Sequence, residues 1–320
     1  MMIGKVILVA MMALLFSVVI YISFLVYLQG KEPIKITMDG PQENTLTQIR
    51  QPVKIPDASQ ASYTREMQFF ANMRFPKSLI SYNIDLACDS GKKEKMKKAF
   101  DILEEKIGNL KFSEVNSGED ITISCTVTEQ SVNENYFIVG EGGATSVINT
   151  SLFSIIEKGE VQLFYKESQC NNSNIEIHEL LHALGFQHSE NKNSIMYNVS
   201  DCEQIITEDI IKELTWLYSI DELPDLAIKN INATKHGLYM DFNIEIRNQG
   251  LKQAAESTLE VYSKNKKIQD FEVGKVEYGA GKLLNVENLY VGIGSDEFKF
   301  VIKDGRDLDE TNNFIEVAFS

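Results

Sequence analysis

The chain has 320 residues, of which 43% are hydrophobic and 24% are charged, and its formal net charge is −15. This length can hold a membrane anchor and two ordinary domains, and the sequence contains no internal repeats. The acidic balance argues against a nucleic-acid partner, which would need a basic surface, and is typical of a solubilising exterior.

The N-terminus carries an uninterrupted apolar stretch. Residues 6–28 contain no charged side chain and are numerous enough to cross a bilayer as one helix. Met1 and Lys5 place positive charge before this stretch, which favours a cytoplasmic end at residues 1–5 and both domains outside the cytoplasm. The alternative is a cleaved signal peptide and secretion. The length of the stretch, and the lack of a small-x-small cleavage site after it, favour an uncleaved signal anchor in a single-pass membrane protein.

Residues 29–74 are predicted to be a stalk or linker. They contain Pro33, Pro41, Pro52 and Pro56 together with many Gln, Thr and Lys residues, and they show little periodicity.

An amphipathic helix is predicted before Gly108, which can end it. Apolar residues recur there at a helical period, while lysine and acidic residues cover the other side. The apolar face comprises Met96, Phe100, Leu103, Ile107 and Leu110.

The most informative segment reads His178-Glu179-Leu180-Leu181-His182-Ala183-Leu184-Gly185-Phe186-Gln187-His188. Because His178 and His182 are four residues apart, they lie on one face of a helix and can bind the same metal ion. Gly185 can adopt a positive φ and end the helix, so that His188 approaches from another direction. Three neutral nitrogens leave one tetrahedral position of zinc open to water, which is typical of a catalytic zinc centre.

Glu179 is the expected general base. It would take a proton from the zinc-activated water and later deliver it to the leaving amine of a cleaved peptide bond. Downstream, Met196 is expected in the apolar floor beneath the histidines, because a thioether is a weak zinc ligand. Tyr197 is expected to line the pocket or pack beside it. The alternative to a metal site is an amphipathic helix whose histidines are ordinary core or surface residues.

A further helix follows, for which Thr207 is a candidate N-cap. Glu208 and Asp209 favour its first turn through the helix dipole. Its predicted buried face comprises Ile210, Ile211, Leu214 and Leu217.

After Pro224 the pattern changes to alternation. The predicted inward residues are Leu238, Met240, Phe242, Ile244 and Ile246, and a strand is predicted at Glu297–Lys303. Residues 223–320 therefore suit an all-β, immunoglobulin-like sandwich. Its acidic turn from Asp304 to Glu310 has carboxylates that suit Ca²⁺; the alternative is that they bond to their own backbone.

The zinc segment resembles that of the metzincin metallopeptidases, and Ser189 with the Met196-Tyr197 pair resembles the matrixin branch. The segments 79–84 and 120–124 resemble its first and third strands, and 206–218 resembles its last helix. The resemblance implies an α+β zinc peptidase domain at residues 75–222, with a twisted mixed sheet, an active-site helix and one catalytic Zn²⁺. It also implies that residues 140–148 are a loop leading into a substrate-binding edge strand; a glycine-rich surface loop is the alternative.

Residues 223–320 resemble the bacterial cell-adhesion-related domain through Pro224-Asp225-Leu226, Asn248-Gln249-Gly250 and the closing Asp309-Glu310-Thr311-Asn312-Asn313. The resemblance is compatible with a surface ligand of this C-terminal domain; it leaves open whether the domain recruits substrate, binds a wall polymer or only spaces the enzyme from its neighbours.

Four cysteines lie in the predicted external part, which agrees with export. Of three possible connectivities, the favoured one joins Cys88 to Cys125, which follow the first strand and close the third, and Cys170 to Cys202, which bracket the zinc segment. Free buried thiols are the alternative.

Two functions fit these observations. The first is a membrane-anchored, extracytoplasmic zinc endopeptidase that acts on proteins or peptides. The second is a non-catalytic surface binding or adhesion protein that retains the metzincin-like fold. Glu179 favours the enzyme, because a binding module does not need a base.

Overall fold

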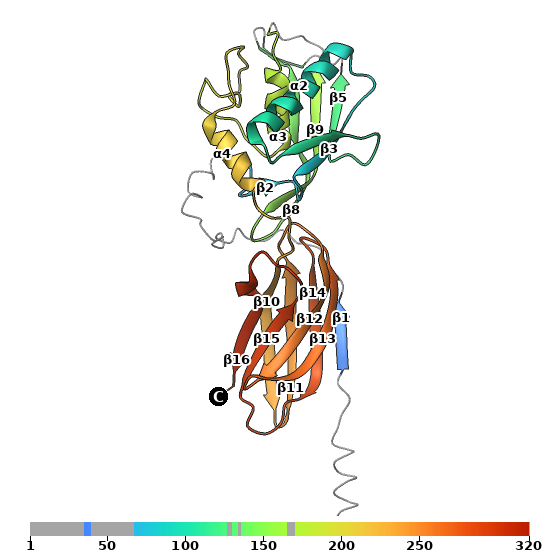
Figure 1. Cartoon of the computed structure of the whole chain (residues 1–320), viewed down its shortest axis with the longest axis vertical. Helices are drawn as coiled ribbons and strands as arrows, with labels where there is room; N and C mark the ends of the chain where they lie inside the picture. The colour runs from blue at the N-terminus through green and yellow to red at the C-terminus, as the bar shows by residue number, and fades with distance from the viewer. Residues whose placement is uncertain (1–34, 40–66, 127–129, 134–135, 165–169, 320) are drawn as a thin grey trace, which may run out of the picture.

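The computed structural model describes residues 35–39, 67–126, 130–133, 136–164 and 170–319. The predicted cytoplasmic end and the predicted span at 6–28 lie outside these residues. Within the described ranges, no helix combines the length and apolar character needed to span a bilayer. Figure 1 shows an α+β domain above a β-sandwich.

The α+β domain contains a mixed sheet in which most neighbours are parallel and one edge strand is antiparallel. Strand β9 (Ser154–Phe164) lies next to the antiparallel edge: β8 (Gly140–Asn149) pairs antiparallel along one side of it, and β5 (Ile121–Thr126) pairs parallel along the other. The strands are β2 (Met73–Arg74), β9 (Ser154–Phe164), β5 (Ile121–Thr126), β3 (Leu79–Ile84), β4 (Lys111–Glu114) and β8 (Gly140–Asn149). Strands β6 (Gln130–Asn133) and β7 (Tyr136–Ile138) form a separate two-stranded sheet.

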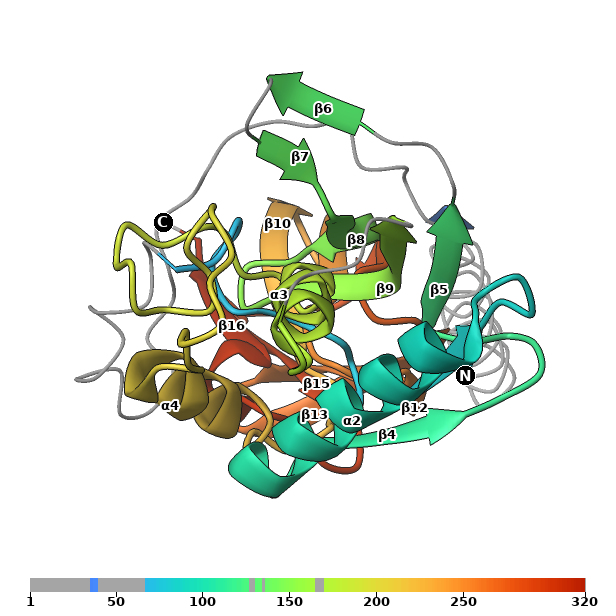
Figure 2. The same cartoon turned by 90° about the horizontal axis from the view of Figure 1, so that it is seen from above.

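Three helices accompany the sheet: α2 (Ser90–Ile107), α3 (Asn174–Ala183) and α4 (Glu208–Leu217). In Figure 2, α3 lies between β8 and α2. Strands and helices share one core, in which the predicted faces of α2 and α4 are largely buried. The sequence therefore located these helices correctly by their apolar periodicity.

The residues at the helix ends differ in whether they cap the helix as the sequence suggests. The Asp89 side chain accepts a hydrogen bond from the Lys92 N–H at 2.9 Å, and α2 stops at Gly108 with a φ of 73°. Leu110 is buried but lies beyond the helix. Thr207 precedes α4 as predicted, yet its side chain makes no capping hydrogen bond.

The β-sandwich consists of two four-stranded antiparallel sheets. One contains β1 (Lys35–Asp39), β14 (Gly281–Tyr290), β11 (Tyr239–Asn248) and β10 (Leu226–His236). The other contains β13 (Lys266–Val276), β12 (Ala254–Ser263), β15 (Glu297–Lys303) and β16 (Phe314–Ala318), with a short 3₁₀ helix, η2 (Glu310–Asn312), before the last strand. The predicted alternation in β11 holds from Met240 to Ile246, whereas Leu238 lies in the preceding turn and is exposed.

The prediction of a continuous linker at 29–74 was wrong in two places. Residues 35–39 form β1, which pairs with β14 from Lys35↔Glu287 to Asp39↔Leu283. Residues 67–74 already belong to the α+β domain, where Gln68 is buried and bonds both ways with the Met73 backbone. The sequence concealed β1 because a five-residue edge strand has too little alternation to be recognised locally.

The two domains contact each other through the turn between β8 and β9. Leu152, Phe153 and Ile155 pack in one buried cluster with Leu251 of the sandwich. Polar contacts surround it: the Thr150 hydroxyl donates to the Gln249 carbonyl at 3.0 Å, and Lys229 Nζ donates to Ser151 Oγ at 2.7 Å. The sandwich is therefore attached to the hairpin that contains the sheet's edge strand.

Both favoured disulfides are present. Cys88 is bonded to Cys125, and Cys170 to Cys202. The first joins the end of β5 to the segment before α2, and the second encloses the whole zinc segment.

Candidate metal centre

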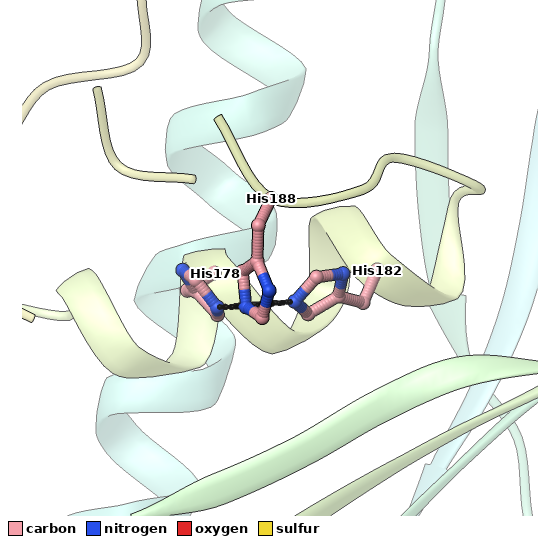
Figure 3. A group of neighbouring side chains, drawn as sticks. All are labelled: His178, His182 and His188. Atoms are coloured by element: carbon pink, nitrogen blue, oxygen red, sulfur yellow. Dashed lines mark hydrogen bonds between the residues drawn. The ribbon is translucent and has the colours of Figure 1, made fainter. Parts of the chain in front are cut away.

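Helix α3 supplies the first two histidines. His178 and His182 are one helical turn apart, and their ring centroids are 4.7 Å apart with the ring planes nearly perpendicular. Figure 3 shows both rings on the same side of the helix. The spacing recognised in the sequence thus places two imidazoles at one point.

Gly185 reverses the chain so that a third histidine can reach this point. Its φ is 97°, and a Cβ there would lie 2.7 Å from Met73 Cγ, so both conformation and space require glycine. The Gly185 N–H donates to the His182 carbonyl at 3.0 Å, which closes the helix. Three residues later, His188 projects toward the other two rings (Figure 3).

The three Nε2 atoms converge. The separations are 3.1 Å for His182–His178, 3.2 Å for His182–His188 and 3.3 Å for His178–His188. Two nitrogens bound tetrahedrally to one zinc at the usual Zn–N length are about 3.3 Å apart. Among the described residues, this is the one group of histidine, cysteine or carboxylate ligands that gathers closely enough to hold a metal ion.

Backbone carbonyls fix which ring nitrogen carries the proton. His178 Nδ1 lies 2.6 Å from the Ile195 carbonyl, and His182 Nδ1 lies 2.7 Å from the Phe186 carbonyl. Because a carbonyl only accepts, Nδ1 is the donor in both rings and both Nε2 atoms present lone pairs. Lone pairs at this distance repel one another unless a cation lies among them, so the donor set fits a zinc ion.

The lowered pKa of each histidine favours the neutral imidazole that metal binding requires, although only His182 is buried, while His178 is half-buried and His188 is exposed. Desolvation is the main cause of the lowered pKa at all three histidines, and it brings the pKa of His182 to about 4. The neighbouring imidazoles lower the pKa of His178 and His182 further.

Glu179 lies beside the first ligand and is 5% exposed. Burial raises its pKa to about 8, and the negative charges of Glu141 and Glu176 add to the shift. A divalent cation at the histidines would act in the opposite direction, because it favours the carboxylate form.

Strand β8 packs directly on the backbone of Glu179. A Cβ at Gly140 would lie 2.7 Å from Glu179 Cγ, and a Cβ at Gly142 would lie 2.1 Å from the Glu179 carbonyl oxygen. The predicted loop at 140–148 is therefore a strand from Gly140 onward, and its glycines allow the close approach to α3.

The segment after His188 folds back against the first histidine and into the core. Met196 is buried in the same core as Leu180 and Leu181, and its carbonyl accepts the Ser189 N–H at 2.8 Å. Tyr197 is half-buried and pairs with Ser189 in an isolated bridge. The residue before Met196, Ile195, provides the carbonyl that lies 2.6 Å from His178 Nδ1.

Sequence reasoning missed several neighbours of the site. Phe69 lies in the predicted linker, yet its ring centroid is 6.1 Å from that of His182, and its N–H donates to the Gly185 carbonyl. The carbonyls of Ile195 and Phe186 leave no signature in the sequence at all. The one signal visible in the sequence was the spacing of Gly140 and Gly142, which allows this strand to approach Glu179 closely.

In the acidic turn of the sandwich, no three carboxylates of the described residues gather closely enough to indicate a calcium site. Asp307 Oδ2 accepts the Leu226 N–H at 2.8 Å, and Asp309 Oδ1 accepts the Thr311 N–H at 3.0 Å. Asp225 is buried close to Asp307, and desolvation followed by that negative charge raises its pKa to about 7. These carboxylates bond to the backbone, which was the alternative interpretation.

Comparison with known families agrees with the two-domain arrangement. Residues 75–219 match the family model described as Matrixin, and residues 223–316 match the model described as CARDB. A search of curated proteins found no match.

Proposed function

Because the chain carries a matrixin metallopeptidase domain followed by a CARDB domain, we propose that it is a zinc-dependent endopeptidase held outside the cytoplasm by a span at 6–28. The observation that carries the catalytic part is the convergence of three histidine Nε2 atoms, 3.1 to 3.3 Å apart, next to Glu179. The family implies zinc, and the geometry fits it.

In this proposal the protein's own groups have separate tasks. His178, His182 and His188 hold the metal, and the carbonyls of Ile195 and Phe186 orient the first two rings. Zinc, when bound, supplies Lewis acidity that lowers the pKa of water and polarises a carbonyl.

Glu179 moves the proton. Its carboxylate takes a proton from the attacking water, the remaining hydroxide forms the new bond to the carbonyl carbon, and the C–N bond breaks. Glu179 then delivers that proton to the nitrogen of the leaving amine, and the proton of the added O–H group stays on the carboxyl product until this ionises. The buried position of Glu179 next to His178 supports this role.

Strand β8 is the proposed substrate edge. It pairs with β9 on one side, and no described strand pairs with its other side. An open edge can bind an extended peptide through backbone hydrogen bonds, without requiring one sequence. Its contact with Glu179 would bring such a peptide to the metal centre.

The proposed location rests on sequence and covalent chemistry. The apolar stretch at 6–28 is the proposed anchor, and two disulfides are typical of an oxidising compartment.

The decisive experiment compares the full chain with Glu179→Gln and the surface control Glu160→Gln on casein. The wild type and the control should cleave it, and Glu179→Gln should retain bound zinc but lose activity by at least about 100-fold, the range for a positioned acid–base group. Equal activity of all three would eliminate Glu179 as the base. Zinc binding without cleavage by the wild type would favour the alternative, a surface binding protein, which the CARDB domain supports.

A further inference from the structure

One end of the β-sandwich lies opposite the peptidase domain. At the near end, Gly279 packs against Ile148 of β8. Strands β10, β12 and β14 run from there to the turns at 236–239, 263–266 and 290–297, which together form what we call the distal end. In Figure 1 this end points away from the metal-binding domain.

The N-terminal part of the chain enters the structure at the distal end. Lys35 pairs with Glu287 and Asp39 with Leu283, while β14 ends at Tyr290 on the distal side. Strand β1 therefore runs from the distal end toward the peptidase domain. The apolar stretch ends at residue 28, and the six residues between it and β1 can reach at most about 20 Å.

The distal end presents apolar side chains to solvent. Ile293 is 89% exposed and Tyr290 is 53% exposed, and Leu238 is exposed in the adjoining turn. Gly292 and Gly294 flank Ile293 with φ values of 81° and 70°, and the N–H groups of Val291 and Gly292 both donate to the Leu238 carbonyl. Left-handed glycines and these hydrogen bonds thus hold an isoleucine outward.

Exposed apolar residues are common when they are scattered singly. Here three of them occupy the end at which the predicted anchor arrives, and exposed Lys264 and Lys266 stand in the neighbouring turn. An aliphatic side chain and a tyrosine at one rim match the apolar boundary and the interface of a bilayer, and the rim carries both signs of charge, because Asp296 and Glu297 are exposed in the same set of turns as the lysines.

We propose that the distal end is a membrane-contacting surface, with Ile293 and Leu238 inserted at the headgroup boundary. The sandwich then serves as a pedestal that holds the metal centre away from the bilayer, although it comes last in the sequence. This rests on the proposed anchoring by residues 6–28. Because β11 alone spans ten residues, the zinc site lies at least about 30 Å from the surface.

The test uses the full chain in lipid vesicles with single fluorophores. Since the four cysteines are all in disulfides, Ile293→Cys, Lys266→Cys and Lys252→Cys each add one thiol. Lys252 is the matched control, because it is exposed at the opposite end of the same sandwich. Each sample is floated on a density gradient, and its fluorescence is compared with and without lipids that carry a nitroxide quencher on the headgroup.

The expected result is flotation of all three variants, with loss of most fluorescence at 293 and 266 and no loss at 252. The label at position 266 replaces a charged side chain, so quenching there cannot be explained by insertion of an apolar label at position 293. Flotation with no quenching at 293 and 266, or with equal quenching at 252, overturns the membrane contact while leaving the anchor intact. Failure to float overturns both, and casein cleavage by the same samples reports separately on the peptidase.

Discussion

Three neighbouring glycines of β8 should respond very differently to alanine. A Cβ at Gly142 would lie 2.1 Å from the Glu179 carbonyl oxygen and 2.7 Å from its carbonyl carbon, whereas a Cβ at Gly143 would meet nothing within 4 Å. Since the neighbours at Gly142 belong to the backbone of α3, no side-chain rotation can relieve the overlap. The strand and the helix must separate by about 1 Å before ordinary contact distances return.

Gly142→Ala should lower the free energy of unfolding by about 1–3 kcal/mol, the usual cost of overpacking. For a protein of this size each kcal/mol lowers Tm by about 2–4 °C. Gly143→Ala should change stability by less than about 0.5 kcal/mol, because the added Cβ would project into open space. Gly140→Ala meets Glu179 Cγ at 2.7 Å and Oε1 at 2.8 Å, so it should displace the carboxyl group and reduce activity more than stability.

Urea unfolding would measure the stability of each variant, provided that the m-values are unchanged. Casein cleavage and zinc content would measure the effects on activity and on the metal centre. Equal stability of Gly142→Ala and Gly143→Ala would refute the close packing of β8 on α3. Full activity of Gly140→Ala would show that the Glu179 carboxyl does not need its present position.

Three further outcomes are expected. Replacing the Cys170–Cys202 disulfide by serines should lower the free energy of unfolding by about 4 kcal/mol, and removal of the other disulfide should cost about as much, because the sequence separations of 32 and 37 are similar. Only the loss of Cys170–Cys202, which encloses the histidines, should also lower the affinity for zinc, measured by competition with a chelator. Equal loss of zinc affinity in the two variants would contradict this. Glu213 is buried with one oxygen unpaired, and desolvation raises its pKa to about 7. The pKa of Glu213 is higher in the folded than in the unfolded state, so the free energy of unfolding should fall by up to about 3 kcal/mol as pH rises from about 4.5 to 7. Glu213→Gln should abolish this pH dependence in urea titrations. An unchanged pH dependence would mean that another group causes it. Phe153→Ala should cost about 3–5 kcal/mol and loosen the domain contact, so that calorimetry shows two separated transitions, whereas a single transition would mean that the domains do not depend on this cluster.

Local periodicity was sufficient for the elements that bury one face. The apolar spacing at Met96, Phe100 and Leu103 predicted α2, because a 3.6-residue repeat needs no information from distant residues. The strand predicted at Glu297–Lys303 is β15 with the same bounds. A turn of the chain at Gly185 was also readable, since few residues other than glycine adopt a positive φ.

Other features depend on residues that are distant in the sequence. Lys35 and Glu287 are 252 positions apart, and their pairing depends on a free edge at β14 that only the folded sandwich creates. The close approach of Gly142 to the Glu179 backbone is likewise decided by how a strand meets a helix. Neither contact produces a repeat within a single window of sequence.

The sequence by itself determined that His178 and His182 face the same way and that His188 can follow a reversal, because helix geometry and glycine conformation are local properties. Only the tertiary structure decided that the carbonyls of Ile195 and Phe186 hold the protons on Nδ1 and leave Nε2 free to bind a metal. It also decided which end of the sandwich receives β1 and which end contacts the peptidase domain. A backbone carbonyl has the same chemistry in every residue, so its position in space, and not the identity of its side chain, gives it this role.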